Sequence, residues 1–209
     1  MRNKDEEFVN AWTHLISSLA CIIVLVYVVA SSKITTFNKV AFLPMGLMSS
    51  WTFFSSYRYH ISSEAKLKER NRSVDRTAIF LMILGCGLSA SLTCINTVFS
   101  ISMCILLCII AGIATVAYNS SKDLPEWLVV TIYITIGWFA TIPSLGIFAE
   151  SLYTISGVTP YILASGALYC IGIIFYTKDS VKWNHTIWHL FVMAGAFTHI
   201  FAHIHSITR

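Results

Sequence analysis

The sequence predicts an all-α membrane protein, a bundle of seven transmembrane helices. Of its 209 residues, 56% are hydrophobic and only 11% are charged, and the mean hydropathy is +0.71. A soluble domain of this size needs more charge to cover its surface. A helix needs about 20 mainly apolar residues to cross roughly 30 Å of hydrocarbon. Long segments without Lys, Arg, Asp or Glu occupy 11–32, 40–57, 77–121, 127–149, 151–177 and 183–208.

These segments predict seven transmembrane spans in a single integral membrane domain, residues 1–209. The leader MRNKDEEF is acidic as well as basic and no small-residue cleavage site follows the first apolar run. We therefore expect a retained span there, not a secretory signal. The segment 77–121 is long enough for two passes, with the polar stretch SLTCINT as the turn between them. The predicted spans are 11–32, 40–59, 75–93, 97–118, 126–148, 156–177 and 184–206.

The basic residues predict the orientation of these spans. With the N-terminus in the cytoplasm, the inner side holds eleven of the fourteen basic residues: Arg2, Lys4, Arg58, Lys66, Lys68, Arg70, Arg72, Arg76, Lys122, Lys178 and Lys182. Only Lys33, Lys39 and Arg209 remain outside, so the positive-inside rule predicts a cytoplasmic N-terminus and an outer C-terminus. We expect a multi-pass protein of the cell membrane, the inner membrane in a Gram-negative bacterium. The net charge of +4 does not indicate a nucleic-acid partner, and the oligomeric state stays open.

Ionisable residues gather at the predicted inner ends of three spans. His60 ends the second span, Asp75 begins the third, and His185 and His189 open the seventh. Residues four apart on a helix share one face, with Cβ atoms about 5–6 Å apart, so His185 and His189 can bind one metal ion. A third histidine from another helix would complete a set that leaves an open position, as in catalytic zinc sites, although iron, copper and nickel also accept imidazole. The same spacing links Ser56 to His60.

The roles of the neighbouring polar residues follow from this hypothesis. Asp75 would be a ligand or, as we favour, a carboxylate that holds the metal-bound water and takes its proton. Ser56 could donate a hydrogen bond to that water or to a substrate carbonyl. The alternatives stay open, because a histidine within a helix is commonly a hydrogen-bonded core or interfacial residue. Asp75 could also serve only to cap the third helix, since acids suit an N-terminal turn.

The other histidines give weaker indications. His199 and His203 are also four apart, but at about 1.5 Å per residue they lie some 15 Å beyond His189 and cannot share its metal. We expect His199 to pack inside the bundle, and His203 and His205 to lie in the outer interface. His14 borders the predicted site, although an interfacial or interhelical hydrogen bond is the interpretation we favour for it.

Separated motifs occur in a characteristic order along the chain. They are NAWTH at 10–14, SYRYH at 56–60 followed by VDRTAIFLMILG at 74–85, and HTIWHLFVMAGAFTH at 185–199. With these motifs the chain resembles the hemolysin III proteins of the progestin and adipoQ receptor superfamily, from the first span to the last. It departs from many bacterial members in having Arg76 after Asp75 in place of a histidine, and GCGLSA at 85–90 where GTYTP is usual.

The resemblance implies a seven-helix bundle with a cytoplasmic N-terminus and a zinc site near the inner leaflet. By position, His60, His185 and His189 match the family's metal ligands. Asp75 matches the acid beside the metal, and Ser56 matches the serine of the S-x-x-x-H motif. Receptor relatives are associated with ceramide amide hydrolysis, and bacterial members are named for haemolysis and linked to membrane homeostasis.

Three functions fit these patterns, each with membrane lipid as the partner. The first is a zinc-dependent hydrolase that cleaves a lipid amide or ester bond while the apolar interior receives the acyl chain. The second is a non-enzymatic sensor or regulator of membrane homeostasis, in which the metal is structural. The third is a pore-forming cytolysin. We rank it last, because a conducting path needs a polar lining and the fourth to sixth spans offer only scattered Ser, Thr and Tyr.

Overall fold

A computed structural model of the chain describes residues 3–93, 97–120, 124–142, 158–178 and 180–208. Within these ranges the protein forms seven α-helices and no strand. The helices are α1 (Lys4–Ala30), α2 (Thr36–Ile61), α3 (Ala65–Leu92), α4 (Thr97–Ser120), α5 (Glu126–Thr141), α7 (Thr159–Tyr176) and α8 (Asn184–Ile207). The all-α prediction is confirmed.

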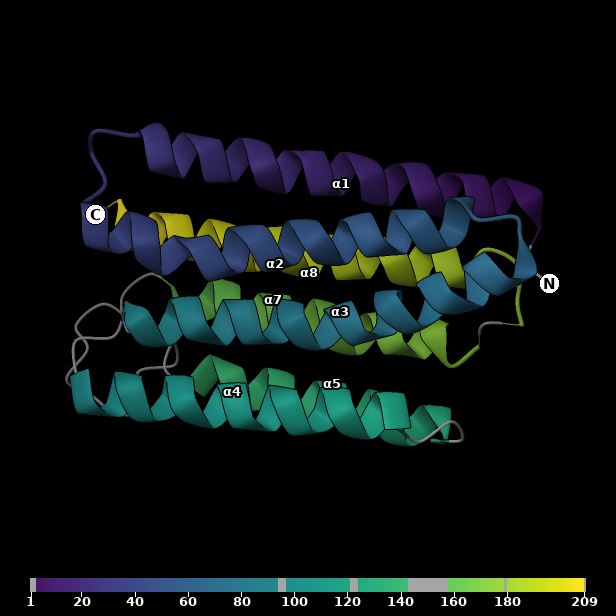
Figure 1. Cartoon of the computed structure of the whole chain (residues 1–209). Coiled ribbons are helices and arrows are strands. Elements are labelled where there is room, and N and C mark those ends of the chain that lie inside the picture. The colour runs from purple at the N-terminus through teal and green to yellow at the C-terminus, as the bar shows by residue number, and fades with distance from the viewer. Residues whose placement is uncertain (1–2, 94–96, 121–123, 143–157, 179, 209) are drawn as a thin grey trace.

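The helices lie side by side in one bundle with their axes roughly aligned (Figure 1). Helix α1 lies along one edge and α4 with α5 along the opposite edge, and the two termini lie at opposite ends of the bundle. Five segments are long and apolar enough to cross a membrane: α1, α3, α7, α8 and residues Ile101–Ser120 of α4. Helix α2 has 26 residues and so spans about 39 Å at 1.5 Å per residue. The protein is a multi-pass membrane protein, and its described residues form a bundle of seven helices.

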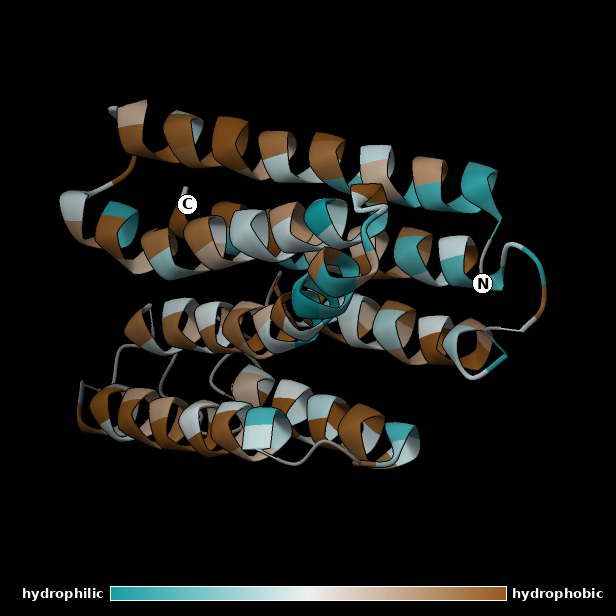
Figure 2. Ribbon diagram, turned by 45° about the vertical axis from the view of Figure 1, so that its right-hand side comes forward, coloured by the Kyte–Doolittle hydropathy of each residue, from teal (hydrophilic) through white to brown (hydrophobic). Residues whose placement is uncertain are grey.

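Two helices begin several residues before the apolar segments from which they were predicted. Helix α1 starts at Lys4 and α3 at Ala65, whereas the predicted spans start at residues 11 and 75. The side chain of Asn3 caps α1 by accepting a hydrogen bond from the N–H of Asp5 at 3.4 Å, and the start of α3 is rich in lysine, glutamate and arginine, which favour helix. Hydrophilic residues gather in these first turns (Figure 2). The acids of the leader are therefore carried on a helix that packs against the bundle.

The main apolar core lies between α1, α2, α3 and α8, and includes Val28, Phe42, Met45 and Phe53, all fully buried. Outside this core, many apolar side chains on the outer surfaces of the helices are exposed, such as Ile23 at 68% and Ile113 at 65%. A lipid-facing surface explains this exposure, because hydrocarbon solvates apolar side chains.

Helices α2 and α3 make a close contact at Pro44. A proline inside a helix interrupts the backbone hydrogen-bond ladder, and here the N–H of Met45 donates to the Ser89 hydroxyl at 3.1 Å. Opposite this point lies Gly85, where a Cβ atom would be only 2.6 Å from the carbonyl oxygen of Pro44. The small residues of the GCGLSA segment therefore allow the two backbones to approach, as small residues do in membrane helix pairs.

Candidate metal centre

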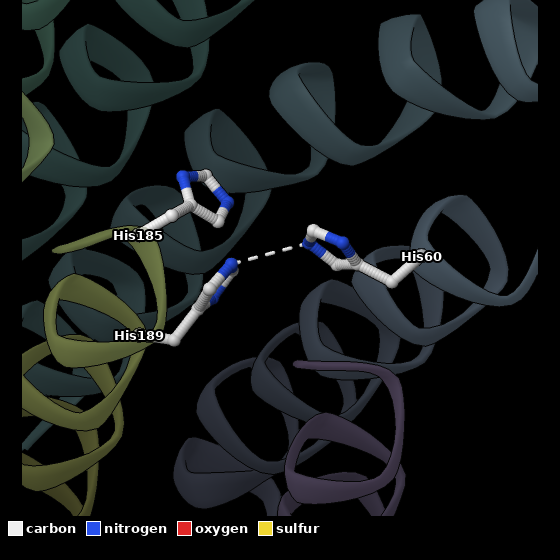
Figure 3. A group of neighbouring side chains, drawn as sticks. All are labelled: His60, His185 and His189. Atoms are coloured by element: carbon white, nitrogen blue, oxygen red, sulfur yellow. Dashed lines mark hydrogen bonds between the residues drawn. The ribbon is translucent and has the colours of Figure 1, made fainter. Parts of the chain in front are cut away.

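Three histidines from two helices meet at the end of the bundle where the N-terminus lies. Their candidate ligand nitrogens all lie within 4.8 Å of one another, and the residues are 3%, 7% and 2% exposed for His60, His185 and His189. The rings point toward a common space (Figure 3). Nε2 of His60 is 3.2 Å from Nε2 of His189, and the ring centroids of His185 and His189 are 4.4 Å apart.

This geometry fits a bound metal ion. Two imidazole nitrogens on a tetrahedral zinc, each bonded at about 2.0–2.1 Å, stand about 3.3 Å apart. The two Nε2 atoms of His60 and His189 already have nearly that separation, at 3.2 Å. The donor set is three buried imidazoles, the set that catalytic zinc accepts when its fourth position is open. The cluster of His60, His185 and His189 can therefore hold a metal ion.

Local structure explains how the three histidines are held. His185 is the second residue of α8 and His189 follows one turn later. His60 is the last residue but one of α2, and the connection to α3 is fixed by Asn71. Its side-chain amide donates to the carbonyl of Arg58 at 3.2 Å and to the hydroxyl of Ser62 at 2.8 Å. The end of α2 is thereby tied to α3, which limits the movement of His60.

The first turns of α1 bring two carboxylates to this region. Oε2 of Glu7 is 3.0 Å from Nδ1 of His60 and 2.9 Å from Nζ of Lys68. Oε1 of the buried Glu6 accepts a hydrogen bond from the backbone N–H of Trp183 at 2.6 Å. Sequence reasoning missed both acids, because it treated the leader only as charge beside a membrane span. A signal was present: Glu7, Asn10 and His14 follow helical spacing and line one face of α1.

His14 and Asn10 extend this polar face beside the cluster. The His14 ring lies edge-on to His189 with centroids 4.1 Å apart, and its centroid is 6.5 Å from that of His60. Asn10 is fully buried and His14 nearly so. Among the described residues, neither the ring nitrogens of His14 nor the amide atoms of Asn10 have a hydrogen-bond partner. Burying such groups unpaired costs about 1–3 kcal/mol each, so this face is suited to contact a polar molecule.

Ser56 and Asp75 lie at one level of the α2/α3 pair. The hydroxyl of Thr52 donates to the carbonyl of Ala78 at 2.8 Å. One turn from this contact toward the histidine cluster, α2 carries Ser56 and α3 carries Asp75. Ser56 is buried, and its hydroxyl has no hydrogen-bond partner within the described part of the chain. Asp75 is half-buried. The chemical roles of both residues remain predictions.

Arg76, the residue after Asp75, pairs with groups on other helices. Its Nη2 is 2.5 Å from Oε1 of Glu126 on α5, and the hydroxyl of Tyr176 on α7 donates to the same carboxylate. The Tyr133 hydroxyl donates to the Arg76 carbonyl at 2.9 Å. The Tyr176 ring centroid is 6.4 Å from that of His185. The charge of Arg76 is therefore balanced, and the residue joins α3 to α5 and α7 beside the cluster.

The second histidine pair of α8 lies toward the opposite end of the bundle. His199 and His203 are both buried, and the His203 centroid is 6.4 Å from that of Phe42, near the start of α2. We expected His203 in the outer interface, but it is only 3% exposed because it packs between α8 and α2. His205 contacts Tyr161, with ring centroids 6.1 Å apart. His199 and His203 pack within the bundle, His205 is partly exposed, and all three lie far from the cluster.

The comparisons with known proteins cover most of the chain. A family model described as Haemolysin-III related matches residues 2–200. The chain belongs to the haemolysin-III family. Among its haemolysin-III relatives, the hemolysin-3 homolog of Bacillus subtilis (strain 168) is 26% identical over 196 residues, which is 91% of this chain and 89% of the relative. Hemolysin-3 of Bacillus cereus is 28% identical over 195 residues, covering 91% and 87%. The resemblance inferred from the motifs is thus confirmed.

Proposed function

We propose that this haemolysin-III protein binds zinc through His60, His185 and His189 and hydrolyses an amide or ester bond of a membrane lipid. The observation that carries the proposal is the convergence of three buried imidazoles, with all ligand nitrogens within 4.8 Å of one another. Three nitrogen ligands leave the fourth position of zinc open, which is the arrangement of hydrolytic rather than structural sites.

The chain supplies the groups that such a reaction needs. Zinc bound there supplies Lewis acidity and activates water for attack on a carbonyl carbon. In our proposal, Asp75 takes a proton from the attacking water and later delivers it to the amine or alcohol that leaves. The Ser56 hydroxyl donates a hydrogen bond to the substrate carbonyl. One C–N or C–O bond breaks, and a fatty acid and an amine or alcohol are released.

The position of the cluster supports a lipid substrate. Helix α2 ends one residue after His60, so the cluster lies near one end of the bundle, not at its middle. Amide and ester bonds of lipids lie near the ends of the hydrocarbon region, where such a site would meet them. We propose that this end faces the cytoplasm, in agreement with the distribution of basic residues.

Metal analysis and lipid hydrolysis test the proposal in separate steps. We expect purified wild-type protein to carry one zinc per chain and His185→Ala to carry none, while His205→Ala, changed outside the cluster, keeps its zinc. Full zinc retention by His185→Ala would exclude the ligand assignment.

The second step uses liposomes that contain ceramide or phosphatidylglycerol and measures fatty-acid release. We expect wild-type protein to release fatty acid and Asp75→Asn to lose this activity while it keeps its zinc. If zinc-loaded wild-type protein released no fatty acid from either lipid, a structural metal in a non-enzymatic regulator would be the better assignment. Stepwise ion conductance through the same liposomes would favour the pore.

A further inference from the structure

The first turn of α1 carries three consecutive acids that face different surroundings. Asp5 is exposed, Glu6 is 5% exposed and buried, and Glu7 is half-buried. Glu6 and Glu7 contact α8 and α2, the two helices that carry the histidine cluster, whereas the Asp5 carboxylate contacts Asn3. One turn of one helix therefore offers two functional candidates and an internal control.

Glu7 lies directly behind His60. Its carboxylate is 3.0 Å from Nδ1 of His60, and the His60 side chain is fully shielded from solvent. A carboxylate accepts a hydrogen bond and does not donate one when ionised, so Nδ1 of His60 carries the proton in this contact. The neutral ring then has its lone pair on Nε2, the nitrogen that lies 3.2 Å from Nε2 of His189. The Glu7 contact thus turns the metal-binding nitrogen of His60 into the cluster.

Lys68 also contacts this carboxylate. Its ammonium group on α3 is 2.9 Å from the same Oε2 atom that contacts His60. The Lys68 side chain is 31% exposed and that of Glu7 is 17% exposed, so solvent weakens the ion pair itself. The more buried contact is the one to His60. Lys68 therefore serves mainly to orient the Glu7 carboxylate.

Glu6 acts on the other ligand-bearing helix. Its Oε1 accepts the backbone N–H of Trp183 at 2.6 Å, and Trp183 is the N-cap residue of α8, with a positive φ of 69° and no capping hydrogen bond from its own side chain. A negative charge at this place is favourable, because a helix N-terminus has unpaired N–H groups and a positive dipole end. His185 follows Trp183 by two residues, so the Glu6 contact lies at the start of the helix that carries His185 and His189.

We propose that Glu6 and Glu7 are positioning residues of the metal centre, Glu7 through the His60 ring and Glu6 through the start of α8. This inference rests on the proposed metal site. Carboxylates hydrogen-bonded to the distal nitrogen of a histidine ligand fix its tautomer and raise its basicity, and their loss typically weakens metal affinity about 10- to 100-fold. A single turn of α1 thereby aligns ligands that lie 129 residues apart in the chain.

The test compares Glu7→Ala, Glu7→Gln and Glu6→Gln with the matched control Asp5→Asn in the full-length purified protein. Zinc affinity is measured by competition with a chelator, and the visible absorption of bound Co²⁺ reports the ligand geometry. Thermal unfolding of the metal-free proteins separates a positioning effect from a loss of folding. If Glu7→Ala does not fold, Glu7→Gln carries the test, since it is nearly isosteric but lacks the charge.

We expect affinity to fall about 10- to 100-fold in Glu7→Ala, with an altered Co²⁺ spectrum, at an unfolding temperature close to that of the wild type. The zinc affinity of Glu6→Gln should fall less, and that of Asp5→Asn should match the wild type. Unchanged affinity in both Glu7 variants would overturn the proposal, as would an equal loss in Asp5→Asn.

A wild-type protein that binds no metal would instead overturn the proposed function. The role of Glu7 would then be decided by ¹⁵N NMR of the histidine rings in the metal-free protein. A His60 signal that shows Nδ1 protonated, and that changes in Glu7→Ala, would support positioning by Glu7. The same signal in both proteins would exclude it.

Discussion

Replacing Gly85 by alanine should weaken the packing of α2 against α3. A Cβ atom at this position lies 2.6 Å from the carbonyl oxygen of Pro44 and 3.0 Å from Cβ of Met48. Real Cβ atoms essentially never approach other atoms closer than 3.0 Å. Because the Pro44 oxygen belongs to the backbone, a side-chain rotation cannot remove the clash, and the two helices must move apart.

The magnitude follows from two opposing effects. Overpacking of this kind costs about 1–3 kcal/mol, while alanine is favoured over glycine inside a helix by about 1 kcal/mol. Gly112 in α4 offers the matched control, because a Cβ atom there meets nothing within 4 Å. The difference between Gly85→Ala and Gly112→Ala therefore isolates the packing cost, about 1–3 kcal/mol of the free energy of unfolding.

Thermal unfolding in detergent micelles, followed by far-ultraviolet circular dichroism, provides the assay. At about 2–4 °C per kcal/mol for a chain of this length, Gly85→Ala should unfold roughly 2–12 °C below Gly112→Ala. Equal unfolding temperatures for the two variants would refute the close approach of α2 and α3 at Pro44. The separation of the helices would also disturb the hydrogen bond from Met45 to Ser89, which belongs to the same contact.

Two further predictions concern the metal site and its surroundings. Zinc at about 100 times its dissociation constant should stabilise the wild type by about 2.7 kcal/mol. In thermal-shift measurements, His189→Ala should lose this stabilisation and His203→Ala should keep it. An equal shift in all three proteins would place the zinc elsewhere. Arg76→Gln should lower the free energy of unfolding only modestly, by up to about 1 kcal/mol, because the Glu126 carboxylate is 51% exposed and screened by solvent. A loss of several kcal/mol in chemical denaturation would contradict this account.

Several features of the fold and site could be predicted from the sequence because they depend on local physical constraints. Hydrocarbon tolerates few charged side chains, so uncharged segments mark the helices of the bundle. Helical periodicity alone places His185 and His189 on one face of α8. The convergence of His60 with this pair also agrees with expectation, since the spans placed all three histidines at the same end of the bundle.

Other features were decided only by the tertiary structure. Glu7 meets His60 across 53 residues of chain, and Glu6 meets Trp183 across 177. Helix α1 began earlier than its apolar segment, so the acids of its first turn turned out to be partners of the site. The burial of His203 against Phe42 was likewise not evident from its position near a helix end.

The sequence by itself determined that this chain crosses the membrane several times and carries paired imidazoles at one end of the bundle, since both properties arise from composition and from the repeat of a single helix. Which carboxylates contact His60 and the start of α8 depended on how neighbouring helices rotate and shift against one another. That arrangement results from side-chain packing among α1, α2, α3 and α8, with close contacts such as Gly85 against Pro44. Packing is a property of all the helices together, and no single segment encodes it.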